Sequence, residues 1–134
     1  MAGFGEAEVA RLLADERIVR NRAKVEAAIA NARAARALLE DGGSLSELVW
    51  SHRPRRRPAP RSRSELPATT PESTALARAL KGRGFRFVGP TTAYALMQAC
   101  GVVNDHLAGC AIRREVEQER RRVLAGRSAP RGAL

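Results

Sequence analysis

A glycine turn between two helical segments is the first feature of this sequence that could do chemistry. Residues 76–100 show a helical pattern on each side of a turn that contains Gly89. Backbone N–H groups at the start of a helix have no partner within it and bind anions such as phosphate. Gly89 would let the backbone approach a phosphate closely, and Thr91 and Thr92 add hydroxyl donors. Spacing alone leaves two interpretations open, a phosphate site or an ordinary helical hairpin with a solvated basic turn.

A second candidate is a pair of metal-binding side chains. His106 and Cys110 are four residues apart, and on a helix such residues share a face and could reach one metal ion. Imidazole and thiolate are common zinc ligands, and structural zinc takes four of them. The chain has only two histidines and two cysteines, and Cys100 is expected to be a small core residue. The pair therefore supplies half a zinc site, and a histidine beside a buried cysteine is the alternative.

A single carboxylate, Asp105, is the third candidate. It is the only acid between Glu72 and Glu115. It could orient a water or stabilise a cation, or it could cap a turn or hold the tautomer of His106. No nucleophile and base stand at a recognisable spacing, and no phosphate-loop lysine motif is present. The residues therefore predict no complete active site.

The positive charge is concentrated in two segments. Residues 51–64 carry six arginines and no acid, and residues 111–134 carry seven arginines and three glutamates, which together account for the net charge of +10. Such segments suit a polyanion, because each phosphate contact releases counterions. The alternative is a solvated loop, since 22 of the 24 basic residues are arginine and indicate a chain-wide bias.

The apolar periodicity is helical wherever it is clear, and no strand pattern is present. The sequence predicts an all-α chain with one helical domain over residues 1–110, interrupted by a basic, proline-rich loop over residues 51–67. A basic tail over residues 111–134 is expected to be helical near residues 115–124 and disordered at its end. The predicted helices lie near residues 9–13, 25–39, 45–50, 71–81 and 90–100.

Membrane insertion and export are not expected. The sequence contains no run of 18 apolar residues and no signal-peptide pattern at its start. Two cysteines ten residues apart do not form a disulfide framework. A soluble, cytoplasmic protein with no membrane partner is predicted.

Three segments together resemble the DNA-3-methyladenine glycosylase I family. They are RGFRFVGPTTAYALMQACGVVNDH at residues 83–106, IVRNRAKV at residues 18–25 and LVWS at residues 48–51. The similarity runs from about Val9 to Cys110, with the motifs in the family's order. A match of this length is far more specific than any single feature above.

The resemblance implies an all-helical fold of the helix–hairpin–helix DNA glycosylase superfamily. Its hairpin would centre on Phe87, Val88 and Gly89, and would bind DNA phosphates together with Thr91 and Thr92. Such enzymes flip a damaged base from double-stranded DNA and hydrolyse its bond to deoxyribose. Because 3-methyladenine already carries a positive charge, it is a good leaving group. The resemblance also leads us to expect a monomer that acts on alkylated DNA.

The resemblance also implies a structural zinc, with His106 and Cys110 matching the C-terminal ligand pair. In the family, N-terminal Cys-x-Trp and Tyr-His-Asp-x-Glu-Trp-Gly segments supply the other two zinc ligands, the base-stacking aromatics and the base-recognising glutamate. This sequence lacks those segments, so it is interpreted as truncated at its N-terminus, and its catalytic residues are unassigned. The function is expected to be base-excision repair by hydrolysis of the N-glycosidic bond of 3-methyladenine. The alternative is a non-catalytic helix–hairpin–helix DNA-binding remnant, and Asp105 stays a structural or minor electrostatic candidate.

Overall fold

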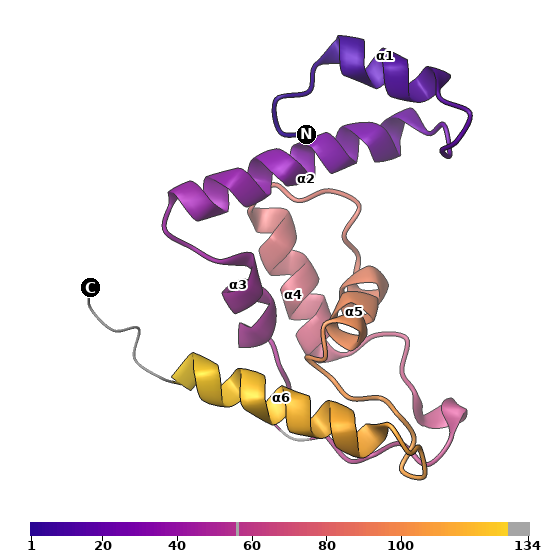
Figure 1. The fold of residues 1–134 in the computed structure, drawn as a ribbon, viewed down its shortest axis with the longest axis vertical. Coiled ribbons are helices and arrows are strands. Elements are labelled where there is room, and N and C mark those ends of the chain that lie inside the picture. Colours follow the sequence, from indigo (N-terminus) through magenta and orange to yellow (C-terminus); the bar gives the residue numbers. More distant parts are fainter. Residues whose placement is uncertain (56, 129–134) are drawn as a thin grey trace.

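The computed structural model describes residues 1–55 and 57–128, and within these ranges every regular element is helical (Figure 1). The all-α prediction is therefore confirmed, and residues 129–134, where disorder was expected, lie outside the described residues. No helix of the described part is long and apolar enough to cross a bilayer. The elements in chain order are α1 (Glu6–Ala14), α2 (Arg22–Glu40), α3 (Leu45–Ser51), the 3₁₀ turn η1 (Arg63–Glu65), α4 (Pro71–Gly82), α5 (Pro90–Ala99) and α6 (Arg113–Ser128).

Short polar side chains set the starts of the helices. Asn21 accepts a hydrogen bond from the Lys24 backbone at the start of α2. Thr70 and Ser73 form a reciprocal capping pair at the start of α4, where Pro71 occupies the first helical position. These caps satisfy N–H groups that a helix leaves unpaired, so they fix where each helix begins.

The main core lies among α3, α4, α5 and the segment that follows α5. Leu76, Met97 and Val102 have no exposed surface at all. Trp50 and Tyr94 belong to the same cluster. This packing holds α4 and α5 against each other as a helical hairpin. Both ends of the turn between them are therefore fixed by the core.

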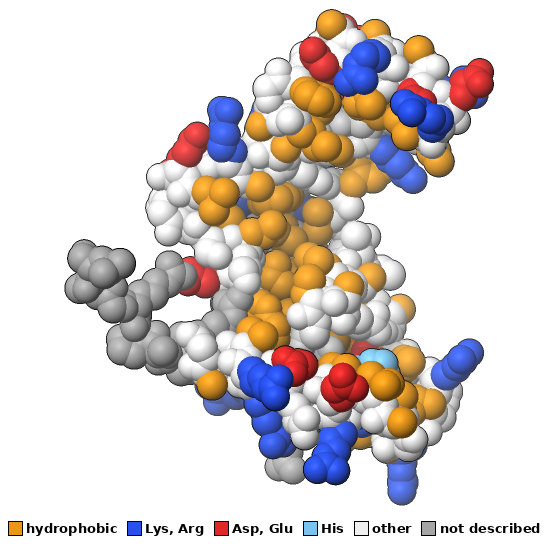
Figure 2. All heavy atoms as spheres, viewed as in Figure 1, with side chains coloured by type: hydrophobic (Ala, Val, Ile, Leu, Met, Phe, Trp, Pro, Cys, Tyr) orange, Lys and Arg blue, Asp and Glu red, His pale blue; other side chains and the backbone are white. Residues whose placement is uncertain are grey.

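A smaller apolar cluster joins α1 to α2 through Val9, Val25 and Ile29. In Figure 1, α1 lies along α2 at one end of the molecule, and α6 crosses the opposite end. Figure 2 shows apolar side chains in a band down the middle of this face, with Lys and Arg side chains at both ends, over α1 and α2 and around α6. The basic tail predicted from the sequence is thus largely a folded helix.

The end of α4 sets the direction of the chain as it enters the hairpin turn. Gly84 has a φ of 86°, its N–H donates to Lys81 O at 3.0 Å, and the Phe85 N–H donates to Leu80 O at 3.1 Å. This pair of bonds is the Schellman arrangement, which favours glycine because of its positive φ. Phe85 is buried in the same core cluster as Leu80. The position of the residue that precedes the exposed turn is therefore fixed by packing.

The segment after α5 differs from the sequence-based expectation. Cys100 lies one residue beyond the end of α5 and is exposed, so its assignment to the core is wrong. Met97 is the last inward-facing residue of α5, and Gly101 then turns the chain with a φ of 69°. Cys100 instead lines a shallow groove beside α6.

Candidate functional site

The hairpin turn places an exposed aromatic residue in an unusual backbone conformation. Phe87 has a φ of 58° and is 60% exposed. A residue with a Cβ pays about 1–2 kcal/mol to adopt this left-handed region. Because no burial of Phe87 compensates for that cost, the strain indicates a surface shaped for contact with something outside the chain.

Gly89 begins α5 with its backbone open to the outside. It is the N-cap residue, it makes no side-chain cap, and a Cβ built on it would meet nothing within 4 Å. The first intrahelical bond runs from Ala93 N–H to Gly89 O at 2.8 Å. The N–H groups of Thr91 and Thr92 therefore have no acceptor within the helix, and both residues are exposed. The protein itself does not require glycine here, so the open space suits an external anion.

One residue that holds the turn was missed by the sequence analysis. Asn31, in the middle of α2, donates from Nδ2 to Arg86 O at 3.1 Å and accepts at Oδ1 from the Arg86 N–H at 2.7 Å. Asparagine is unfavourable inside a helix because its side chain competes for backbone hydrogen bonds. Its position within an alanine-rich helix was the signal that could have pointed to a long-range contact.

His106 and Cys110 are brought together, but not by a helix. Both lie in the irregular segment between α5 and α6, so the helical premise for this pair is wrong. Turns in that segment nevertheless place Cys110 Sγ 3.6 Å from His106 Nδ1. Two corners of a zinc tetrahedron lie about 3.6 Å apart, given Zn–S of about 2.3 Å and Zn–N of about 2.0–2.1 Å. The pair fits two zinc positions, and no cluster of three or more potential ligands occurs among the described residues.

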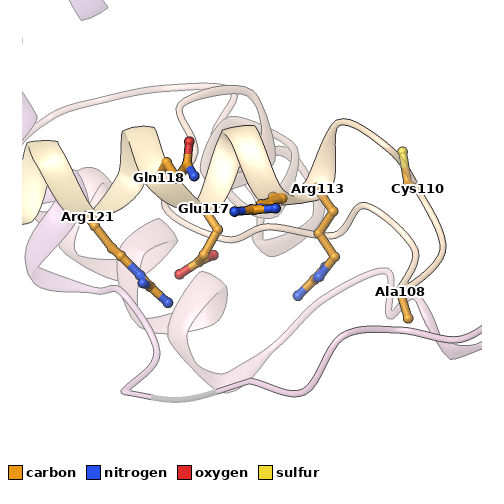
Figure 3. A pocket seen from close by; sticks show the side chains of 7 residues that line it. Ala108, Cys110, Arg113, Glu117, Gln118 and Arg121 are labelled. Carbon is orange, nitrogen blue, oxygen red and sulfur yellow. The ribbon is translucent and has the colours of Figure 1, made fainter.

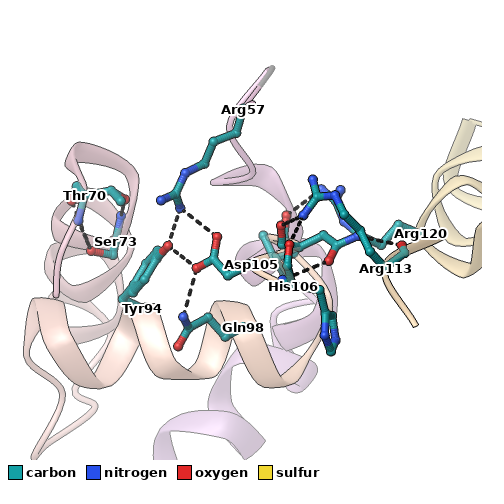
Figure 4. Close-up of polar contacts among 11 residues, drawn as sticks. Arg57, Thr70, Ser73, Tyr94, Gln98, Asp105, His106, Arg113 and Arg120 are labelled. Carbon is teal, nitrogen blue, oxygen red and sulfur yellow. Dashed lines mark hydrogen bonds and ion pairs between the residues drawn. The ribbon is translucent and has the colours of Figure 1, made fainter. Parts of the chain in front are cut away.

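Asp105 forms a buried polar cluster with Arg57 and Tyr94 (Figure 4). Its Oδ2 accepts from the Tyr94 hydroxyl and from Gln98 Nε2, and its Oδ1 lies 3.3 Å from Arg57 Nη1. Arg57 also donates to the Tyr94 hydroxyl and lies 5.5 Å from the centre of its ring. Within the described residues Asp105 makes no bond to the His106 side chain. The carboxylate therefore fastens the basic loop to α5.

The electrostatics of this cluster keep Tyr94 protonated. Burial raises the pKa of its hydroxyl, the bond to the Asp105 carboxylate raises it further, and Arg57 only partly opposes the change. Tyr94 therefore stays a hydrogen-bond donor across the ordinary pH range. The cluster is a fixed support that joins Arg57, Tyr94 and Asp105.

Comparison with known proteins decides the family. The sequence matches the methyladenine glycosylase family over residues 1–114, most of the chain. The protein belongs to this family. It is 46% identical over 113 residues to DNA-3-methyladenine glycosylase 1 of Escherichia coli K12, and 46% identical over 96 residues to DNA-3-methyladenine glycosylase of Haemophilus influenzae. The first match covers 82% of this chain and 60% of the relative, and the second covers 69% and 51%.

Solved methyladenine glycosylases have the same fold. A crystal structure of 3-methyladenine DNA glycosylase I superposes with a TM-score of 0.78 at 46% identity, covering 82% of this chain and 62% of that one. The Staphylococcus aureus enzyme, solved to explain its recognition of 3-methyladenine, gives 0.76 at 27% identity, covering 84% and 61%. The chain thus spans between half and two thirds of the length of these relatives.

Proposed function

We propose that this protein acts in base-excision repair and removes 3-methyladenine from alkylated double-stranded DNA. Its membership of the methyladenine glycosylase family carries the proposal. In this reaction the damaged base flips out of the DNA stack. Its N-glycosidic bond to deoxyribose breaks, and a water oxygen bonds to the sugar carbon in place of the base. A base that is already cationic departs without a strong acid, so binding and orientation supply most of the catalysis. Because its substrate would be cellular DNA, a cytoplasmic location forms part of this proposal.

The hairpin turn would supply the contact with the DNA backbone. The unpaired N–H groups of Thr91 and Thr92, their hydroxyls and the open space at Gly89 suit a phosphate oxygen. Phe87, which is exposed, and Val88 would lie beside the DNA strand that carries this phosphate. These contacts set position and carry no sequence preference, as damage-specific binding requires.

His106 and Cys110 would hold a structural zinc. The 3.6 Å separation of their donor atoms supports this assignment. Zinc would tie the segment after α5 to the two further ligands that a four-coordinate site needs. The loop backbone already contributes to the order of this region, because Ala108 N–H donates to Pro60 O at 2.8 Å.

A second function, DNA binding without base excision, is favoured by the placement of the aromatic side chains. Trp50 and Tyr94 are 7% and 2% exposed, so neither is free to stack on a flipped base. Phe85 is buried in the same core, and Phe87 stands alone on the turn. Phe4 packs against the smaller cluster of α1 and α2. This arrangement would support DNA binding without an aromatic cage for a cationic base.

An excision assay on the full chain separates the two functions. We expect release of 3-methyladenine from methylated duplex DNA, measured by chromatography of the free base, with heat-denatured protein as the blank. Binding of the same duplex is measured in parallel by fluorescence anisotropy. Duplex binding without base release would contradict the glycosylase proposal and support the second function. A chain that neither releases the base nor binds the duplex would contradict both proposed functions.

A further inference from the structure

A hollow of about 320 Å³ lies between the basic loop and α6. We call residues 53–63, which follow α3, the arginine loop. The volume of the hollow is far above the ~10–15 Å³ that a cavity needs to hold one water molecule. The hollow is lined by six arginines, from the arginine loop and from α6: Arg53, Arg55, Arg57, Arg113, Arg120 and Arg121. The two basic segments of the sequence thus face the same space.

Most of this positive charge is not neutralised. Among the described residues, Arg57 pairs with Asp105 and Arg120 pairs with Glu117, and Glu117 is the only acid that lines the hollow. The remaining four guanidinium groups make no ion pair within the described part of the chain, although Arg121 is near enough to Glu117 to help lower the pKa of that carboxyl. These belong to Arg53, Arg55, Arg113 and Arg121.

The hollow has both fixed and free donors. Arg113 donates to Asn104 O at 2.9 Å and to His106 O, so its position is set by neutral carbonyls that do not cancel its charge. Arg55 and Arg121 are exposed, and their N–H groups stay available to a ligand. Figure 3 shows Arg113, Glu117 and Arg121 extending from α6 toward the same side, in the adjoining pocket that shares these residues. A guanidinium group held in place beside others whose N–H groups are available can bind the oxygens of a phosphate group.

We propose that this hollow binds a phosphate group of the DNA backbone, at a contact separate from the hairpin turn. The proposal rests on the proposed function in taking DNA as the ligand. The family match ends at residue 114, so it includes the lining arginines of the arginine loop and Arg113 at the start of α6. Arg120 and Arg121 come from beyond that boundary, so α6 completes the second contact.

The test is the salt dependence of duplex binding by the full chain. We compare the wild type with Arg55→Gln/Arg121→Gln, using a 20-base-pair undamaged duplex, about two turns of DNA, over a series of NaCl concentrations. Each lost phosphate contact removes about 0.9 from the slope of log K against log salt, so loss of the one proposed contact should make the slope shallower by about 0.9. Arg55→Lys/Arg121→Lys should keep most of the wild-type slope, because the charges remain.

A matched control removes the same charge elsewhere. Arg11→Gln/Arg20→Gln changes two exposed arginines at the α1 end of the molecule, and we expect a slope close to that of the wild type. A wild-type slope for Arg55→Gln/Arg121→Gln, or an equal change in the control, would overturn the proposed contact. If the slope changes but no base is released in the excision assay, the contact stands and the glycosylase proposal fails. If base is released and the slope is unchanged, the reverse holds.

Discussion

The side-chain amide of Asn31 makes two hydrogen bonds with the backbone of Arg86, one from each end, at 3.1 and 2.7 Å. α2 thereby holds the residue that directly precedes the strained Phe87. Replacing Asn31 by Ala removes both bonds, and we expect the free energy of unfolding to fall by about 1–2 kcal/mol. Chemical denaturation followed by the fluorescence of Trp50, the single tryptophan, measures this change.

Asn31→Asp is the control for that prediction, because it keeps the acceptor for the Arg86 N–H and loses the donor. Its stability should lie between those of the wild type and Asn31→Ala. Duplex affinity should also fall in Asn31→Ala, since the turn loses its anchor. An alanine variant with wild-type stability and affinity would show that the core alone orders the hairpin.

Gly89 provides a variant that changes DNA binding without harming the fold. Gly89→Asp puts a carboxylate at the N-cap of α5, where aspartate is a favourable cap and a Cβ meets nothing within 4 Å. We expect a melting temperature equal to or above that of the wild type, with duplex affinity about tenfold or more weaker through repulsion of the phosphate.

Two further variants separate charge from other effects at Gly89. Gly89→Asn adds a similar cap without charge and should bind far better than Gly89→Asp. Gly3→Asp adds the same charge at an exposed glycine near α1, where a Cβ also meets nothing within 4 Å. Equal affinities for Gly89→Asp and Gly3→Asp would place the DNA contact away from the hairpin.

Local signals in the sequence were sufficient for the helices and for the turn. Thr70 with Pro71 stands at the start of α4, and Gly89 with Pro90 stands at the start of α5. Caps and prolines act through neighbouring backbone groups, so their effect can be inferred without knowing the rest of the fold. The same reasoning applies to Ser44 before α3.

Contacts between distant segments could not be inferred in this way. The pairing of Arg57 with Asp105 depends on how an irregular loop returns to α5, and no periodic pattern encodes that path. His106 and Cys110 approach each other through turns, although their spacing indicated a helix. Cys100 was assigned to the core because the helical pattern was extended past Ala99, where the chain turns.

The raised pKa of Tyr94 predicts an alkaline loss of stability. Tyr94 is the single tyrosine, so tyrosinate absorbance reports this residue alone. Its folded-state midpoint should lie above the value of about 10 for the unfolded chain, because of burial and the Asp105 carboxylate. The stabilisation is fully present below pH 10 and is lost as pH rises toward the folded-state pKa.

Tyr94→Phe should remove this dependence and flatten the plot of unfolding free energy against pH above about 10. It should also lower stability at neutral pH, because Asp105 loses a donor. A native protein that titrates at or below the unfolded midpoint would contradict the cluster described here. Trp50 fluorescence confirms that the protein is still folded at each pH.

Zinc affinity should depend on His106 and on only one of the two cysteines. His106→Ala and Cys110→Ala each remove a ligand, so affinity should fall by more than the ~10–100-fold that loss of an outer partner costs. Cys100→Ala is the matched control, since Cys100 is exposed and makes no described contact with His106. Competition with a chromophoric chelator gives the affinities. Stoichiometric, tight zinc in the His106/Cys110 double variant would disprove this ligand pair.

Arg120 fastens α6 to the rest of the fold, and its removal tests whether α6 is an integral part of the protein. Its side chain is 16% exposed, with Nε donating to Gly101 O at 2.6 Å, Nη2 to Val102 O at 2.9 Å and Nη1 to Glu117 at 2.7 Å. Burial acts to raise the pKa of Glu117, but its bonds and nearby arginines outweigh this and lower it. The glutamate is therefore charged at neutral pH, and in Arg120→Ala it would lose its ion pair and keep only the 3.4 Å bond from Asn104 Nδ2 and the nearby charge of Arg121.

We expect Arg120→Ala to lower the free energy of unfolding by about 1–3 kcal/mol and to shift Trp50 emission to the red. The emission reports on α6 because Trp50 and Arg120 line the same groove. Arg122→Ala is the control: its side chain is 74% exposed and pairs with Glu119, so the change should stay within about 0.5 kcal/mol. Equal behaviour of the two variants would mean that α6 contributes nothing through these carbonyls. The hollow beside it would then lack a rigid wall.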